Sequence, residues 1–355
     1  MTSAPKPPLS VWSRIDWRNA LFLTLTPIAA LILVPISIYR DGFSWGLFAF
    51  FAVSFVISNM SITCGYHRCF SHRSYDAHPI VELLYVLLGS GAFQGSVLEW
   101  CTDHRRHHRM VDTNHDPYSI KKGFWYAHIG WLFTKDESRH AGPFAKDLER
   151  RKLIAFQHRH YALIATSVGF GLPGALGWAM GFGWGGLIFG GLLRVVCSEH
   201  STFFINSLCH TLGRQPYNDA HTARDSSLMA LFTFGEGYHN FHHQFQADYR
   251  NGVRWYQWDP TKWWIRSLSL VGLARRLKQA SKEEILKARL AMDERLMLAR
   301  GASADRLAGL KARITDAADR MRRQTRVERS RARTDFRVAR RQWRAYARSL
   351  RTEAA

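Results

Sequence analysis

Residues 20–39 read ALFLTLTPIAALILVPISIY, twenty residues without a charged side chain. A helix of that length crosses the hydrocarbon core of a bilayer, which is about 30 Å thick. Residues 43–63, FSWGLFAFFAVSFVISNMSIT, form a second uncharged run, and only Arg40, Asp41 and Gly42 separate the two. So short a connection predicts an antiparallel hairpin of two membrane-spanning helices.

A second pair of apolar runs lies at residues 161–179 and 182–205, joined by a glycine-rich turn. The later run contains Arg194 and Glu199, so its helix either extends beyond the membrane or presents these charges to a polar interior. A fifth run, 79–98, predicts a buried or interfacial helix. We therefore expect an all-α integral membrane protein with four transmembrane helices in two hairpins.

The composition excludes several classes of protein. Hydrophobic residues make up 46% of the chain, which is incompatible with a disordered or fibrous protein. The five cysteines are scattered and none lies in a CxxC motif, so we expect neither a disulfide framework nor a thiolate zinc site. The first 20 residues do not read as a cleaved signal peptide.

Charge is concentrated at the C-terminus and predicts the orientation. The net charge is +21, and residues 275–355 contain 24 of the 49 basic and 10 of the 28 acidic side chains. With four spans, the N-terminus, the basic stretch 105–152 and the C-terminus share one side, which the positive-inside rule assigns to the cytoplasm. We expect a cytosolic segment 1–19, a membrane domain 20–275 with a cytosolic helical cap, and a basic helical extension 276–355.

The histidines form clusters at the ends of the predicted spans. HRCFSH occupies 67–72, HRRHH occupies 104–108, HNFHH occupies 239–243, and NSLCH occupies 206–210 at the end of the fourth span. On a helix, positions i, i+3 and i+4 share a face, so each HxxHH is expected to aim three imidazoles at one point.

These clusters predict a transition-metal centre. Neutral imidazole binds iron, zinc, copper and nickel, and nine histidines exceed the needs of one zinc site, which indicates two metal ions. The sequence has no HExxH protease motif and no thiolate cluster for an iron–sulfur centre. Two irons beside lipid suggest oxidation of an unactivated C–H bond.

At this point the sequence resembles a known family. HRCFSH, EWCTDHRRHH, NSLCH and GEGYHNFHH are similar to the motifs of the integral-membrane acyl-CoA desaturases, the stearoyl-CoA Δ9 family, and the similarity runs from about residue 43 to 275. The resemblance implies two irons and a water held by Asn206. The implied iron ligands are His67, His72, His104, His107, His108, His210, His239, His242 and His243.

The same resemblance implies where the substrate lies. Gln94, Trp100 and Thr202 match residues that bend the acyl chain, and Lys121 and Lys122 match residues that contact the phosphates of its carrier.

Near these positions, one residue matches the family pattern and three differ from it. Asp103 of the second box is retained, whereas Gly95, Ser96 and Thr102 depart from the mammalian pattern, so the carrier stays open between CoA, acyl carrier protein and phospholipid.

Two further residues are expected at the substrate site from their position alone. Phe55 and Asn59 lie 12 and 8 residues before His67 on the second predicted span. There they are expected to form the floor of the tunnel that holds the acyl chain.

The activity implied is desaturation of a long-chain acyl thioester, giving a cis double bond at Δ9, with O2 as oxidant. The sequence has no HPGG haem-binding motif, so we expect an external electron donor of the ferredoxin or cytochrome b5 type with an NAD(P)H reductase.

Other functions remain open at the level of sequence. A membrane diiron hydroxylase of lipids or alkanes uses similar histidine boxes, and a non-catalytic zinc-binding membrane protein would use three or four of the histidines. The arginine-rich run 320–351 is compatible with lipid headgroups, an acidic electron donor, nucleic acid or plain solvation. Because no base-reading motif is present, we expect no nucleic-acid partner.

Overall fold

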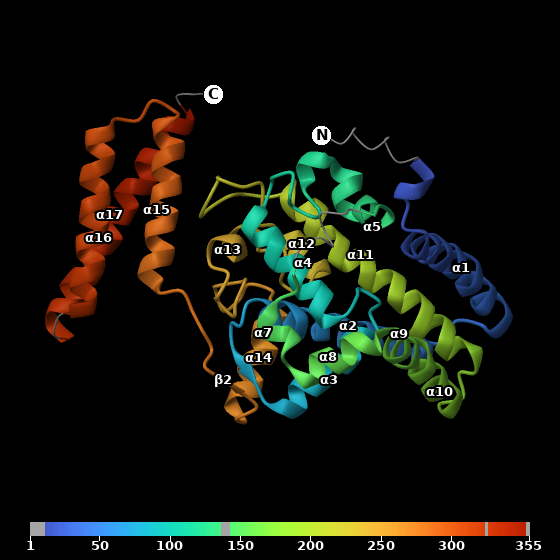
Figure 1. Ribbon diagram of the computed structural model, residues 1–355. Coiled ribbons are helices and arrows are strands. Elements are labelled where there is room, and N and C mark those ends of the chain that lie inside the picture. The colour runs from blue at the N-terminus through green and yellow to red at the C-terminus, as the bar shows by residue number, and fades with distance from the viewer. Residues whose placement is uncertain (1–10, 136–142, 324–325, 353–355) are drawn as a thin grey trace, which may run out of the picture. The chain divides into compact units, whose positions relative to one another are not determined.

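The computed structural model describes residues 11–135, 143–323 and 326–352, and it is mostly helical with almost no sheet (Figure 1). The start of the predicted segment 1–19 and residues 136–142 of the basic stretch therefore lie outside the described residues. Contacts divide the chain into two units. The first comprises Met1–Gly213 and His221–Gln279, and the second comprises Arg214–Ala220 and Ala280–Ala355.

The first unit begins with the predicted hairpin of long apolar helices. After a short turn, η1 (Val11–Arg14), come α1 (Trp17–Asp41) and then α2 (Trp45–Met60), which continues directly into η2 (Ser61–Ser71). The Asp16 side chain accepts a hydrogen bond from Asn19 N and caps α1, and Ser44 caps α2 in the same way. Because the second helix runs on beyond the apolar residues 43–63, it carries the first histidine box with it.

The second hairpin consists of two composite helices. One joins α9 (Tyr161–Thr166), η5 (Ser167–Gly171) and α10 (Leu172–Ala179), and the other joins η6 (Gly186–Leu193), α11 (Arg194–Ser207) and η7 (Leu208–His210). A Cβ atom at Gly177 would lie 2.4 Å from Gly186 Cα, so glycine is required where the two helices approach. Four helices, 17–41, 45–71, 161–179 and 186–210, are long and apolar enough to cross a membrane, which confirms the predicted four spans.

The charges of the fourth span point into the protein. Arg194 is 2% exposed, and its guanidinium donates to the carbonyl oxygens of Gly190, Gly91 and Gly169. Glu199, five residues later, is also buried. Of the two alternatives that the sequence left open, the polar interior is therefore the one observed.

The run 79–98 forms two helices rather than the single helix expected. Helix α3 (Pro79–Ser90) ends in a turn in which Phe93 and Gly95 have φ of +58° and +94°, and α4 (Val97–Met110) begins after it. A capping box starts α4, because Ser96 accepts from Glu99 N while the Glu99 carboxylate accepts from Ser96 N. The turn frees α4 to carry the second histidine box.

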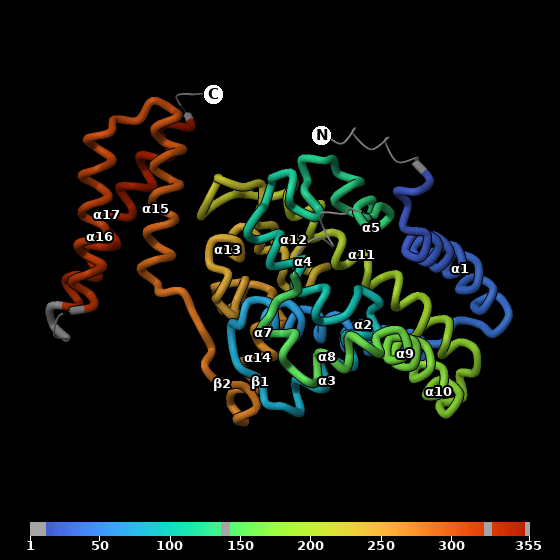
Figure 2. The backbone as a smooth tube through the Cα atoms, in the orientation of Figure 1, coloured from blue at the N-terminus to red at the C-terminus, as the bar shows by residue number. Residues whose placement is uncertain are grey.

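Short elements complete the first unit. Strands β1 (Asp76–Ala77) and β2 (Ala274–Arg275) pair antiparallel although they are far apart in sequence (Figure 2). The remaining elements are η3 (Ile120–Lys122), η4 (Tyr126–Gly130), α5 (Trp131–Phe133), α7 (Lys146–Glu149), α8 (Lys152–Arg159), α12 (Ser227–Phe232), α13 (His239–Gln244) and α14 (Pro260–Leu270).

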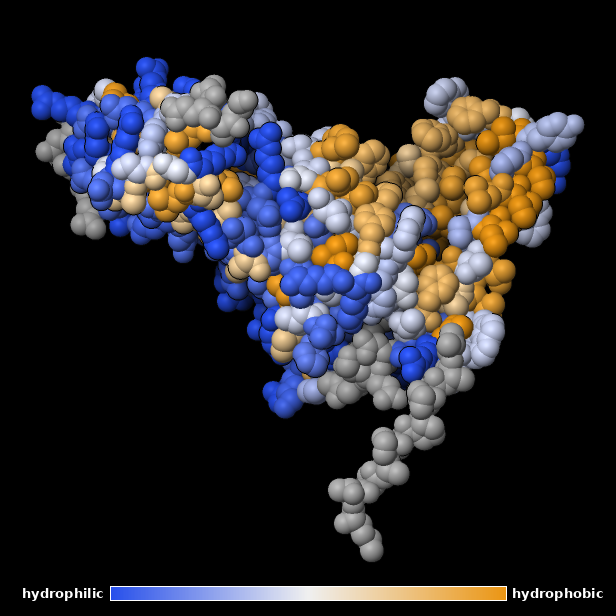
Figure 3. Space-filling model, turned by 90° about the horizontal axis from the view of Figure 1, so that it is seen from above, coloured by the Kyte–Doolittle hydropathy of each residue, from blue (hydrophilic) through white to orange (hydrophobic). Residues whose placement is uncertain are grey.

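The spans expose apolar side chains, whereas the main core of the unit lies among η2, α3, α4 and α14. Leu31 on α1 is 77% exposed and Val53 on α2 is 58% exposed. In the space-filling view, hydrophobic surface gathers over the helices that form the spans (Figure 3). That surface is suited to contact with lipid tails.

The second unit is a bundle of three helices, α15 (Lys282–Leu298), α16 (Ala304–Arg323) and α17 (Arg326–Thr352). Its core contains Leu307 and Ile314, which are fully buried and pack with Trp343 of α17. The sequence predicted helix throughout this region, and the structure breaks it at Gly301, which has φ of +81°.

Candidate metal centre

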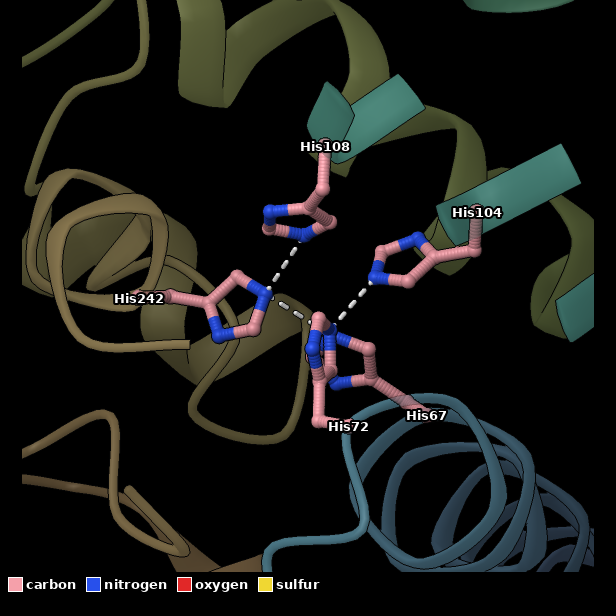
Figure 4. A group of neighbouring side chains, drawn as sticks. All are labelled: His67, His72, His104, His108 and His242. Atoms are coloured by element: carbon pink, nitrogen blue, oxygen red, sulfur yellow. Dashed lines mark hydrogen bonds between the residues drawn. The ribbon is translucent and has the colours of Figure 1, made fainter. Parts of the chain in front are cut away.

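Five histidines from three segments form one cluster. His67 lies near the end of the second span, His72 follows the span, His104 and His108 lie on α4, and His242 lies on α13. Their ligand nitrogens all lie within 4.8 Å of one another. The Nε2 atoms of His72 and His104 are 2.8 Å apart, and that of His242 lies 3.0 Å from His67 and 2.9 Å from His108 (Figure 4). We call this the five-histidine group.

Four more histidines form a second cluster, the four-histidine group. It contains His107 of α4, His210 at the end of the fourth span, and His239 and His243 of α13, all buried. His239 Nε2 lies 3.1 Å from the Nε2 atoms of both His210 and His243, and His107 Nε2 lies 3.3 Å from that of His243.

The three histidines of each HxxHH box are divided between the two groups, whereas the sequence predicted that all three point to one site. On α4 the i, i+4 pair His104 and His108 joins the five-histidine group, and His107 joins the other. On α13 the i, i+4 pair His239 and His243 shares one group and His242 faces the other. Residues four apart stand directly above one another on a helix, whereas the third histidine is rotated toward the neighbouring group. Helices α4 and α13 therefore each contribute histidines to both groups.

The spacing of the Nε2 atoms fits one metal ion in each group. His107 Nδ1 is hydrogen-bonded to Asp116 Oδ1 at 2.9 Å, which places the proton of that ring on Nδ1, and Glu236 Oε2 lies 3.0 Å from His67 Nδ1. The Nε2 lone pairs then face other imidazoles at about 3 Å. Adjacent ligands on one metal ion with bonds of about 2.0–2.1 Å are also roughly 3 Å apart. A cation at each centre would satisfy nitrogens that otherwise repel one another.

The protonation state of the rings suits metal binding as well. Burial, followed by the electrostatic effect of the neighbouring imidazoles, lowers the pKa well below the ordinary value for the six members outside the spans. These are His72, His104, His108, His239, His242 and His243. Neutral imidazole is the form that coordinates a metal.

A buried carboxylate orients His67. Complete burial alone would raise the pKa of Glu236. The pKa is instead held at about 2, because His67 and Arg68 lie against the carboxylate. Arg68 Nη2 donates to Glu236 Oε1 at 2.9 Å and also pairs with Asp259 at 3.0 Å. Glu236 and Asp259 therefore share the positive charge of Arg68, and this pairing fixes the position of Glu236.

A second network orients two members of the four-histidine group. Asp116 accepts from Asp112 N at 3.1 Å while its other oxygen faces His107. Asp112 in turn accepts the Thr222 hydroxyl at 2.8 Å, and the Thr222 oxygen lies 2.7 Å from His210 Nδ1. Since the hydroxyl proton of Thr222 points to Asp112, its oxygen accepts from His210 Nδ1–H, which leaves Nε2 free for a metal.

Sequence reasoning missed these supporting residues. Glu236 stands three residues before His239 in GEGYHNFHH, and Asp116 follows the second box within nine residues of His107. A carboxylate close to a histidine box is a usable signal, because metal-bound histidines usually donate their second N–H to such a group. Thr222 carries no comparable signal in the sequence.

The structure brings three of the predicted substrate residues together. Gln94 donates to Thr202 Oγ1 at 2.9 Å and accepts from Trp100 Nε1 at 3.3 Å. The Trp100 ring stacks on that of His104, with centroids 4.9 Å apart. This set therefore lies directly beside the five-histidine group.

The other predicted residues are more dispersed. Asn59 is buried and donates to Ser198 Oγ at 3.0 Å, and Phe55, one turn earlier, contacts Phe234 with ring centroids 5.5 Å apart. Asp103 is buried on α4, and Asn206 is buried on α11 one turn before His210. The other two, Lys121 and Lys122, are exposed on η3.

Comparison with known proteins agrees with this arrangement. A sequence model of the fatty acid desaturase family matches residues 43–275. Acyl-CoA desaturase 1 of Saccharomyces cerevisiae is 43% identical over 251 residues, which cover 70% of this chain and 49% of the relative. A Schizosaccharomyces pombe protein named "Probable acyl-CoA desaturase" is 40% identical over 278 residues, covering 78% and 57%.

A third relative carries a different substrate in its name. The sn-1 stearoyl-lipid 9-desaturase of Synechocystis is 36% identical over 264 residues, which cover 74% of this chain and 80% of the relative. The chain thus spans about half the length of the two yeast proteins and most of the cyanobacterial one. With the family match extending over most of its residues, the chain belongs to the fatty acid desaturase family.

Proposed function

We propose that this protein is an oxygen-dependent fatty acyl desaturase that introduces a cis double bond, at Δ9, into a long-chain acyl thioester. The observation that carries the proposal is the pair of buried histidine groups, each spaced for one metal ion. Two bound irons, reduced by an external donor, would supply the activation of O2. The five-histidine group would hold one iron, and the four-histidine group with a water on Asn206 would hold the other.

The surrounding side chains position the substrate. Trp100 forms a wall against His104, and the hydrogen bonds from Gln94 to Thr202 and from Trp100 to Gln94 fix that wall. A saturated chain held against a rigid wall presents one pair of methylenes to the metal centre. Phe55 and Asn59 would close the far end of the tunnel and so limit chain length.

The carrier and electron donor follow from chemistry and family names. Lys121 and Lys122 are exposed point charges suited to the phosphates of a carrier, and Asp103 is assigned to the same region. The names of the relatives support both acyl-CoA and stearoyl-lipid as the carrier. We assign acyl-CoA, because both yeast proteins are named for it. The donor would be a ferredoxin or cytochrome b5 with its NAD(P)H reductase.

The membrane orientation is part of the proposal. Basic residues on the N-terminal segment and on the extension 276–355 favour a cytosolic location for both termini and for the histidine boxes. The family match over 43–275 supports a desaturase domain at 20–275 with a short segment, 1–19, before it.

The decisive experiment is expression in an iron-replete host that lacks its own desaturase and supplies reductant. Fatty acids are then resolved by gas chromatography–mass spectrometry with localisation of the double bond. We expect new cis monoenes with the intact chain and none with His107→Ala. His115→Ala, which removes an exposed histidine outside both groups, should behave as the intact chain.

Three outcomes would contradict the proposal. Hydroxylated chains in place of monoenes would indicate a hydroxylase. Tightly bound zinc with no O2 consumption, after addition of a ferredoxin system, would indicate a non-catalytic metal protein. Equal product from His107→Ala would remove the histidine groups from the reaction.

A further inference from the structure

Helix α17 carries a line of arginines on one face. Its sequence contains ten arginines and two acidic residues. Six of the arginines recur at spacings of three or four residues, which keeps them within roughly a quarter of the helix circumference. They are exposed, and we call them the arginine stripe: Arg333, Arg337, Arg341, Arg344, Arg348 and Arg351.

The stripe is not neutralised within the bundle. Among the residues that the structure describes, none of the six forms an ion pair, whereas several acids of the bundle pair with other basic residues. Asp335 of α17 pairs with Arg320 at 3.0 Å, Glu294 with Lys311 at 2.5 Å, and Glu283 with Arg322 at 2.8 Å. These three acids thus pair with basic residues outside the stripe, and the stripe keeps its positive charge.

Most apolar side chains of α17 are turned away from the stripe. Ala339, Trp343 and Leu350 are buried in the bundle core, and Phe336 and Tyr346 pack against that core. Val338, 41% exposed, is the only large apolar side chain of the described part of α17 that is exposed. The stripe therefore has little apolar surface to insert into a bilayer and no aromatic surface on which nucleic-acid bases would stack. Its recognition chemistry is that of guanidinium groups toward phosphate.

We propose that the arginine stripe binds the headgroups of anionic phospholipids in the membrane that contains the protein. Two observations favour lipid over other polyanions. The stripe runs straight for about 27 Å along one helix, as contact with a plane requires. Chain continuity through β2 to α15 also ties the bundle to a membrane-embedded domain, so headgroups are present at a high effective concentration.

The test uses the full chain in nanodiscs of phosphatidylcholine alone or of equal parts phosphatidylcholine and phosphatidylglycerol. A dye attached at Gln342→Cys, an exposed position of α17 outside the stripe, reports energy transfer to acceptor-labelled headgroups. We expect efficient transfer only in discs with phosphatidylglycerol, and loss of transfer as salt rises from 0.05 to 0.5 M, because screening shortens the Debye length.

Two triple variants with the same net charge test whether the position of the arginines matters or only their number. Replacing Arg337, Arg344 and Arg348 by Gln should lower the ratio of bound to free bundle roughly a hundredfold, at about fivefold per arginine near an anionic surface. Replacing Arg300, Arg313 and Arg331, which are exposed elsewhere in the bundle, removes equal charge and should have a much smaller effect.

Two results would overturn the proposal. Equal losses in the two triple variants would mean that net charge alone acts. Transfer that is independent of phosphatidylglycerol, or that appears only after an acidic electron-transfer protein is added, would assign the stripe to another partner. Glutamine is a good helix former, and circular dichroism checks that each variant keeps its helices.

Discussion

At the scale of single residues, the hydroxyl of Thr222 determines the tautomer of His210. Its proton is donated to Asp112, so its oxygen accepts from His210 Nδ1. Thr222→Val keeps the shape of the side chain and removes this link. Loss of such a supporting partner typically weakens metal binding by about 10–100-fold. We expect the iron content after dialysis against a chelator to fall from two toward one per chain, measured by mass spectrometry of the metal.

Two variants make this expectation specific. Thr222→Ser retains the hydroxyl and should keep both irons. Thr211→Val removes a hydroxyl that donates to Ser207 O, one residue from His210, and should also keep both. If Thr222→Ser lost as much iron as Thr222→Val, packing rather than the hydrogen bond would be responsible.

Chain length is a second property set by single residues. Asn59 is 2% exposed and bonded to Ser198, so Asn59→Trp would push an indole toward the end of the proposed tunnel. We expect the products to shift to shorter acyl chains, with selectivity changing by roughly tenfold or more per excluded methylene. Product analysis by mass spectrometry measures this shift. Val53→Trp, on the exposed face of the same helix, serves as control, and unchanged product lengths in Asn59→Trp would reject the role.

At the scale of helices, Arg194 holds four segments together from within. It donates to Gly190 O on its own helix, to Gly91 O after α3, to Gly169 O on η5, and to Ser58 Oγ on α2. Arg194→Met removes the guanidinium donor from these buried acceptors, at about 1–3 kcal/mol each. We expect unfolding in detergent to begin roughly 5–10 °C lower.

The buried thiols of Cys64, Cys101 and Cys209 provide the readout, since a thiol-reactive dye labels them only on unfolding. Arg266→Met removes an exposed arginine of α14 and should leave the transition in place. Equal shifts in both variants would mean that the buried contacts contribute little.

The helices show which features of the fold could be predicted from the sequence and which could not. Four spans and three histidine boxes were predictable because apolar length and histidine spacing are local signals. The break after α3 was also within reach, since the Ser-x-x-Glu capping box at 96–99 is a local signal. The division of each box between two groups was not, because it depends on where histidines from other segments lie in the fold. Likewise Arg194 read only as an ambiguous charge, since two of its three carbonyl partners, Gly91 and Gly169, lie more than 20 residues away in the chain. Glu236 was within reach of the sequence, whereas Thr222 emerges only from the fold.

At the scale of the whole molecule, each unit has its own hydrophobic core. One is built around Tyr66, Phe70 and Ile265, and the other around Leu307, Ile314 and Trp343.

Trp343 is 3% exposed and its Nε1 donates to Asp293, so Trp343→Ala should destabilise the bundle by about 3–5 kcal/mol. We expect hydrogen exchange in α15, α16 and α17 to accelerate while α4 and α13 keep their protection and the iron content is unchanged. Val338→Ala, on the exposed side of α17, should leave exchange as it is. Loss of protection in the histidine-bearing helices as well would show that the two cores unfold as one cooperative structure, because separate cores are expected to open independently.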